Sequence, residues 1–250
     1  MNIPRILIDK IRAADGVVVL TGAGISSESG VPTFREAQTG LWSKYDPQEL
    51  ATPSAFINNP GLVWNWYKWR RELISKASPN SGHQVLANLE NLIRGFTLIT
   101  QNVDGLHQRA GSRKIIDLHG NITRARCWDN EHAFDSWEQI GEKPPTCSKC
   151  GSILRPDVVW FGESLPFRAL TLATEASENC DIFFSIGTSA LIHPAASLAL
   201  IAKRNGASII EINVQTTPLT PESDFFLQGP AGKVLLELEK ELFDRPTTIC

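Results

Sequence analysis

The sequence predicts an α/β fold, a Rossmann-like parallel sheet with helices on both faces that carries a smaller inserted domain. Two observations predict it. Short apolar runs alternate with segments of helical periodicity along most of the chain, which is typical of an open parallel sheet. Glycines or polar residues follow directly after each apolar run, and ligands of such sheets bind outside the carboxyl ends of the strands.

The elements follow from their apolar patterns. Helical spacing predicts helices over residues 4–14, 81–94, 168–179, 194–204 and 232–243. Continuous apolar runs, which favour strands buried on both faces, predict strands over 17–20, 96–99, 115–118, 182–186 and 208–212. The first strand continues into Gly22-Ala23-Gly24, a turn that lets a phosphate approach backbone N–H groups closely.

Two segments interrupt this alternation. Residues 36–80 are rich in Trp, Pro and Asn, and residues 121–157 contain three of the five cysteines. We expect a helical module and a zinc-ribbon-like module that together form the small domain. Residues 1–35, 81–120 and 158–250 then form the Rossmann-like domain.

Composition excludes several classes of protein. The formal net charge of −3 over 250 residues argues against a dedicated nucleic-acid binder. The apolar runs fall far short of the about 20 residues that a membrane span needs. Five cysteines are an odd number and do not indicate a disulfide scaffold. We expect a cytoplasmic monomer with neither a membrane nor a specific nucleic acid as a partner.

Six short motifs lie along the chain: Gly22–Ser26, Gly30–Arg35, Thr100–Asp104, His119-Gly120, Val158–Glu163 and Gly187–Ser189. Their residues and order resemble the sirtuin (Sir2) family of NAD-dependent protein deacylases. The resemblance implies NAD as co-substrate, one structural zinc ion, and acyl-lysine proteins or peptides as partners. It also implies the products, which are nicotinamide, 2′-O-acyl-ADP-ribose and free lysine.

The resemblance assigns roles to individual residues. His119 and Asn102 would be catalytic. Asp104 would hydrogen-bond the nicotinamide carboxamide, Phe34 would cover the ribose, and Arg35 would hold phosphate. The full set of NAD-binding candidates is Gly22, Ala23, Gly24, Ser26, Thr33, Phe34, Arg35, Trp42, Gln101, Asn102, Asp104, Gly187, Thr188, Ser189, Asn213 and Ala231.

His119 is the candidate general base. An unperturbed imidazole has a pKa of about 6.5, so it can accept a proton from a ribose hydroxyl at neutral pH. Its position just past a predicted strand places it with the other polar clusters. The histidines His83, His107, His132 and His193 are predicted to have structural roles.

The substrate candidates fall into two groups. Val158, Val159, Trp160, Phe161 and Gly162 resemble the segment that pairs with the backbone of a substrate peptide. Ala51, Tyr67 and Arg70 resemble the subclass that removes succinyl, malonyl and glutaryl groups. A guanidinium suits the acyl carboxylate, Tyr67 and Arg70 share one helix face, and the small Ala51 leaves room for a longer chain.

Other interpretations remain open. The tryptophans around Arg70 also fit an amphipathic helix with arginine stacked on tryptophan, and the enzyme would then be a plain deacetylase. The same NAD site would also suit ADP-ribosyl transfer, NAD hydrolysis, or a sensor of NAD or ADP-ribose without turnover. The intact His119, Asn102 and Asp104 argue against the sensor.

The cysteine cluster predicts a metal site with an unusual fourth position. Cys147 and Cys150 have the spacing of half a zinc knuckle, and Cys127 lies upstream. Asn130 occupies the position expected for a fourth cysteine, and His132 is an alternative ligand. The competing hypothesis is a site without metal, held by the packing of Trp128, Phe134 and Trp137.

Overall fold

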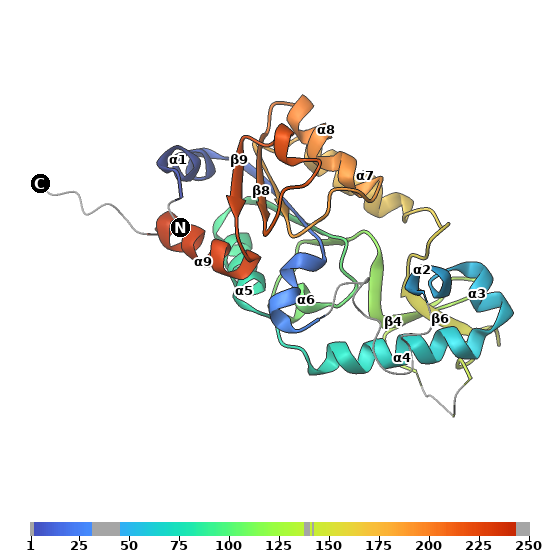
Figure 1. Cartoon of the computed structure of the whole chain (residues 1–250). Helices are drawn as coiled ribbons and strands as arrows, with labels where there is room; N and C mark the ends of the chain where they lie inside the picture. The colour runs from blue at the N-terminus through green and yellow to red at the C-terminus, as the bar shows by residue number, and fades with distance from the viewer. Residues whose placement is uncertain (1–2, 32–45, 138–140, 142, 244–250) are drawn as a thin grey trace, which may run out of the picture.

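The computed structural model describes residues 3–31, 46–137, 141 and 143–243 (Figure 1). The predictions for Thr33, Phe34, Arg35 and Trp42 lie outside these residues. Among the helices described, none is both long and apolar enough to span a bilayer.

A parallel sheet of six strands forms the larger part of the molecule. Its order is β3-β2-β1-β7-β8-β9. The strands are β1 (Gly16–Thr21), β2 (Gly95–Thr100), β3 (Ile115–Asp117), β7 (Ile182–Ile186), β8 (Ser208–Asn213) and β9 (Phe225–Gln228). The chain proceeds from β1 to β2 and β3 on one side, and from β7 to β9 on the other. The topological switch therefore lies between β1 and β7.

Helices cover both faces of this sheet, as the sequence predicts (Figure 1). One face holds α1 (Arg5–Ala13), α5 (Ser81–Leu92) and α9 (Ala231–Phe243), and the other holds α7 (Phe167–Glu178) and α8 (Leu198–Arg204). Alternate residues of β1 pack into the apolar cores on the two faces of the sheet. Val17 and Val19 pack with the first group, whereas Val18 and Leu20 pack with the second. The short helix α6 (Leu106–Arg109) follows β2.

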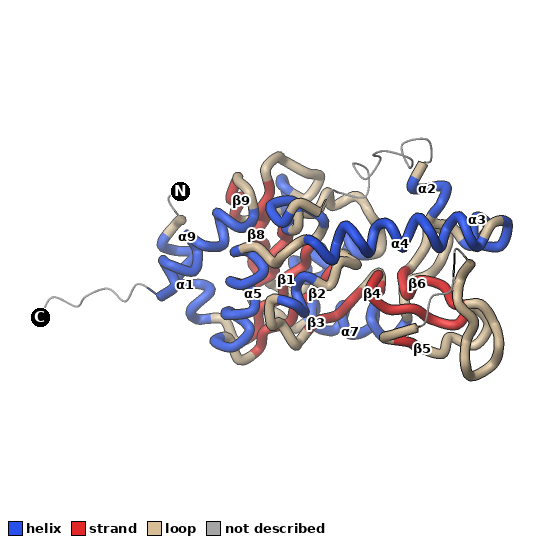
Figure 2. Tube along the Cα trace, turned by 90° about the horizontal axis from the view of Figure 1, so that it is seen from below, coloured by secondary structure: helices blue, strands red, loops and turns tan. Residues whose placement is uncertain are grey.

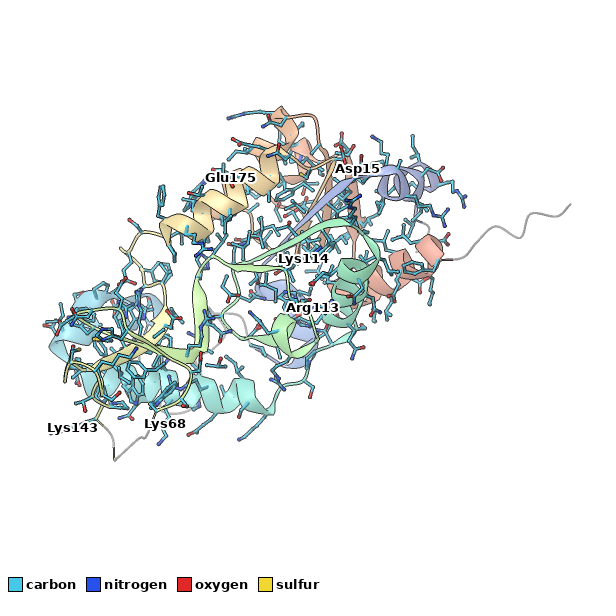
Figure 3. All side chains as sticks on the ribbon, turned by 180° about the vertical axis from the view of Figure 1, so that it is seen from behind. Asp15, Lys68, Arg113, Lys114, Lys143 and Glu175 are labelled. Carbon is cyan, nitrogen blue, oxygen red and sulfur yellow. The ribbon has the colours of Figure 1, made fainter. Side chains whose placement is uncertain are left out.

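The two insertions lie together at one end of the molecule. The first contains α2 (Pro47–Leu50), α3 (Pro53–Asn58) and α4 (Pro60–Lys76), and the second contains an antiparallel sheet of β5 (Ala133–Phe134), β4 (Gly120–Cys127) and β6 (Leu154–Val158). Figure 2 shows α4 running along β4 and β6. In Figure 3, Lys68 of α4 and Lys143 of the second insertion lie at the same end.

Shared apolar cores explain why the insertions associate. Tyr67 of α4 packs in one cluster with Ile122 and Trp160, and Trp64 packs in another with Cys127 and Cys147. The helix itself begins where the sequence provides a cap. The Asn59 side chain accepts a hydrogen bond from the N–H of Leu62, and Pro60 occupies the first turn.

The structure adds strands that apolar patterns do not predict. β4 and β6 carry arginines, and β6 contains Pro156, which disfavours a strand. They form because they pair with each other, with Pro156 opposite Ala125. The four-residue β9 is too short to show a pattern. The helix expected over 194–204 begins as a 3₁₀ turn, and the α-helix starts only at Leu198.

Glycines allow the ends of β1 and β7 to touch. A Cβ on Gly24 would lie 2.7 Å from the Cα of Gly187, and a Cβ on Gly22 would lie 2.8 Å from the Gly187 carbonyl oxygen. Gly187 itself has φ +60°, and a Cβ there would lie 2.6 Å from the backbone nitrogen of Ile25. Backbone packs against backbone here, so no side chain fits.

We expect Gly187→Ala to lower the free energy of unfolding by about 3 kcal/mol or more, because it adds a backbone collision to left-handed strain. Gly111→Ala is the matched control, since Gly111 has φ +103° and no atom within 4 Å of its Cβ position. Backbone strain alone should lower the free energy of unfolding of Gly111→Ala by about 1–2 kcal/mol. Urea unfolding measures the loss of stability in both variants. Equal losses in Gly187→Ala and Gly111→Ala would contradict the backbone contact at Gly187.

Candidate active site

The turns after β1 and β7 form the floor of the candidate site. The Gly24 N–H donates to the Gly187 carbonyl at 2.8 Å, and the Gly22 N–H donates to the Ile186 carbonyl at 3.0 Å. Both turns lie at the topological switch, where open α/β sheets bind their ligands. The glycines that would contact a dinucleotide are thus already brought together by the sheet order.

Polar side chains after β2 join this floor. The Asn102 side-chain amide donates to the Gly22 carbonyl at 3.1 Å and to Ser26 Oγ at 3.2 Å. Ser26 Oγ donates to an oxygen of the buried Asp104 carboxylate at 2.7 Å. The Gln101 amide donates to Thr188 Oγ1 at 3.1 Å. Residues from three strands therefore form one network.

The adenosine-side candidates lie around the same edge. The Asn213 amide, at the end of β8, donates to the Thr188 carbonyl at 2.8 Å. Ala231 is buried at the start of α9. The next residue, Gly232, donates its N–H to Glu28 at 2.6 Å. This bond fastens the start of α9 to the segment that follows the glycine turn. Ser189 is exposed.

His119 lies between the polar network and the substrate segment. Its Nδ1 is 2.8 Å from the Gln101 carbonyl oxygen, which only accepts, so Nδ1 carries the proton and Nε2 keeps its lone pair. Burial lowers the pKa of His119, although the bond to Gln101 opposes this. The imidazole is therefore neutral at pH 7, which is the state that a general base requires.

His83 joins the site, although the sequence gives it only a structural role. Its Nε2 lies 3.4 Å from Ser26 Oγ, and its ring centroid lies 4.8 Å from that of His107. Burial lowers the pKa of His83 to about 4 and that of His107 to about 3, so both rings are neutral. The sequence signal that fixes the position of His83 is a capping box at the start of α5. In this box the Asn80 N–H donates to Nδ1 of His83.

The predicted substrate segment connects the two groups of candidates. The Val159 N–H donates to the His119 carbonyl, and the Phe161 N–H donates to the Ala51 carbonyl, each at 2.9 Å. Val158 and Trp160 point into the core, whereas Phe161 and Gly162 are exposed. The segment therefore lies between the candidate base and the candidate acyl pocket.

Ala51, Tyr67 and Arg70 are close together beside this segment. Ala51 and Tyr67 are buried in one apolar cluster. The guanidinium carbon of Arg70 lies 4.9 Å from the ring centroid of Trp66 and 5.5 Å from that of Tyr67. Burial lowers the pKa of Arg70, while Tyr67 and Asp104 raise it. The expected group of an arginine and a phenol on one helix face is present, and so is the stack on tryptophan.

The cysteine cluster contains a fourth donor. The ligand atoms of Cys127, His132, Cys147 and Cys150 all lie within 4.8 Å of one another. Sγ of Cys127 and Cys150 are 3.4 Å apart, as are Nδ1 of His132 and Sγ of Cys147. Neighbouring thiolates of tetrahedral zinc are about 3.8 Å apart, so this donor set fits a structural zinc ion. Asn130 lies on the exposed side and donates its backbone N–H to Cys127.

Comparison with known proteins identifies the family. The sequence model described as the Sir2 family matches residues 22–194. The chain belongs to the Sir2 family.

Relatives and solved structures of the family cover nearly the whole chain. An NAD-dependent protein deacylase of Aquifex aeolicus is 52% identical over 229 residues, which are 91% of this chain and 94% of the relative. NAD-dependent protein deacylase 2 of Pyrobaculum aerophilum is 51% identical over 242 residues, which are 96% of each chain.

Two solved structures share the fold of this Sir2 chain. A Sir2 homologue in complex with NAD superposes with a TM-score of 0.91 at 49% identity, covering 96% of this chain and 94% of that chain. A mutant Sir2 homologue in complex with 2′-O-acetyl-ADP-ribose gives a TM-score of 0.89 at 49% identity, covering 96% of each chain.

We expect the purified protein to carry up to about one zinc ion per chain, and His132→Ala or Cys147→Ser to lower both zinc content and melting temperature. Asn130→Ala is the matched control and should keep the metal, because Asn130 only donates hydrogen bonds to the cysteines, from its backbone to Cys127 and from its side chain to Cys150, and an amide is a poor zinc ligand. Metal analysis by mass spectrometry and thermal denaturation measure these effects. Full zinc content in His132→Ala would exclude His132 as the fourth ligand.

Proposed function

We propose that this chain, an NAD-dependent protein deacylase of the Sir2 family, prefers succinyl, malonyl and glutaryl groups on lysine and removes acetyl groups more weakly. The observation that carries the deacylation chemistry is the position of His119, and the acyl preference rests on Arg70 and Tyr67 lying side by side on α4. The Nδ1–H of His119 is bonded to Gln101 in the polar network, and its carbonyl is bonded to Val159 in the substrate segment. One residue thus contacts both halves of the site.

The reaction requires that the reacting groups be held in the right orientation and that water be excluded from them. NAD, when bound, supplies the ribose that accepts the acyl oxygen and nicotinamide as the leaving group. Gln101, Asn102 and Asp104 would orient these groups, since they converge at the carboxyl ends of β1 and β2. Such positioning contributes several kcal/mol. His119 would accept a proton from a ribose hydroxyl at Nε2.

The acyl-lysine would enter beside the substrate segment. A peptide would lie extended along Val158–Gly162, using backbone hydrogen bonds that demand little of its sequence. The acyl chain would extend past Ala51, whose small side chain leaves space, toward Tyr67 and Arg70. A guanidinium and a phenol among aromatic rings are suited to a carboxylate, because both donate hydrogen bonds to it.

His119→Ala should reduce deacylation by about 10²- to 10⁴-fold, since it removes the base. The pH profile of kcat/KM adds a second test. His119 acts as the neutral base and its pKa is lowered, so kcat/KM should stay level at neutral pH and fall only below an inflection under about 6.5. Wild-type rates in folded His119→Ala would remove it from the mechanism.

Arg70→Met should lower kcat/KM for succinyl-lysine peptides by about 10- to 100-fold, because a charge-assisted hydrogen bond to the acyl carboxylate is lost. Deacetylation should fall much less, since an acetyl group has no carboxylate. Nicotinamide release with NAD and each peptide measures the ratio of the two activities.

Arg71→Met is the matched control for this test. Arg71 also lies on α4 and stacks on tryptophan. Its guanidinium carbon lies 4.7 Å from the ring centroid of Trp64 and 5.2 Å from that of Trp137, and both rings belong to the apolar cluster around Cys127 and Cys147. Its removal should leave the activity ratio unchanged. A parallel fall of both activities in Arg70→Met would mean that Arg70 only stacks on Trp66, and a plain deacetylase would then be favoured.

A further inference from the structure

Trp160 occupies the centre of an aromatic cluster between the two insertions. Only 2% of its surface is exposed. Its ring centroid lies 5.2 Å from that of Phe56, 6.3 Å from that of Tyr67 and 6.3 Å from that of Trp128. These neighbours come from α3, α4 and the segment after β4. An indole enclosed in this way has no room to rotate.

A buried ion pair also holds Trp160. The guanidinium carbon of Arg155 lies 3.5 Å from the indole centroid. Glu163 binds the Arg155 guanidinium through both carboxylate oxygens, one of them at 2.8 Å, and accepts the Trp160 backbone N–H at 2.8 Å. The Glu163 carboxylate therefore holds both the Arg155 guanidinium above the indole ring and the backbone N–H of Trp160. The direction of the indole N–H is set by these contacts.

That N–H has one acceptor, the Tyr67 hydroxyl at 3.0 Å. An indole N–H only donates, so the Tyr67 oxygen accepts in this contact. The Arg70 side chain also hydrogen-bonds Tyr67 and can only donate to its oxygen. The phenol has one proton, which must then point away from both Trp160 and Arg70 to a different acceptor. Burial raises the pKa of Tyr67, so the phenol keeps this proton at neutral pH. Arg70 lies on the same face of α4 as Tyr67, where the acyl carboxylate is proposed to bind.

We propose that Trp160 is a positioning residue for acyl selectivity, whose indole N–H turns the Tyr67 hydroxyl proton toward the carboxylate of the acyl group. The inference rests on the proposed function. It means that the segment that pairs with the peptide backbone also sets the choice of acyl group, through a side chain that touches neither NAD nor the acyl chain.

A double-mutant cycle tests the proposal. Wild type, Trp160→Phe, Tyr67→Phe and the double variant are compared by kcat/KM for succinyl- and acetyl-lysine peptides at saturating NAD. Trp160→Phe should lower both activities, because it also alters the peptide segment, but the ratio of desuccinylation to deacetylation should fall about 3- to 10-fold. In the Tyr67→Phe background, Trp160→Phe should change the ratio no further.

Two controls separate orientation from packing. Trp64→Phe removes the same indole volume from α4, and within the described residues the Trp64 Nε1 has no hydrogen-bond partner. It should lower the melting temperature and leave the ratio unchanged. If Trp160→Phe fails to fold, 3-benzothienylalanine at position 160 keeps the ring shape, replaces the N–H by sulfur, and should give the same loss of ratio.

The outcomes distinguish the two proposals. If Arg70→Met changes the ratio but neither Trp160 variant does, or if the Trp160 effect persists undiminished without the Tyr67 hydroxyl, the positioning role is wrong and the proposed function stands. If Arg70→Met leaves the ratio at its wild-type value, the acyl preference itself is wrong, and the role of Trp160 falls with it.

Discussion

The contact between the ends of β1 and β7 is the constraint on which the rest of the site depends. Three glycines bring two backbone turns together where a Cβ would lie within 3 Å of backbone atoms. The contact closes the topological switch of the sheet and leaves a carbonyl of each turn facing a side chain at the end of another strand, β2 for one turn and β8 for the other. Asn102 and Asn213 bond to these carbonyls, on Gly22 and Thr188. A floor made of backbone thus orients amides from two further strands.

Burial determines the charge states around this floor. The imidazoles of His83, His107 and His119 have lowered pKa values because each is desolvated, and all three are neutral at pH 7. Among the groups described here, Asp104 is the buried carboxylate next to them, and it accepts hydrogen bonds from Ser26 and from the Leu106 N–H. Neutral rings around one satisfied carboxylate avoid the cost of several buried charges in a small volume.

The packing of the two insertions determines which residues face the floor of glycine turns across the candidate site. Helix α4 contributes aromatic residues to both shared cores, one around Trp160 and one around Cys127 and Cys147. The cysteine cluster and the predicted substrate segment therefore pack against the same helix. Strand β6 joins the two cores, since Leu154 packs in one, Val158 in the other, and Arg155 between them binds Glu163.

The sequence by itself determined the alternation of strands and helices, the glycine turns and the polar residues that end each strand. Local pattern encodes these features, so the parallel sheet and the positions of Gln101, Asn102 and His119 along the chain could be predicted. The tertiary structure alone decided which of these side chains meet, and with which bonds. It placed His83 against Ser26, brought the His132 imidazole in among the cysteines, and set Arg155 and Glu163 around Trp160. Ser26 and His83 are 57 residues apart in the sequence and meet only in the folded chain, and local periodicity carries no information about contacts over such separations.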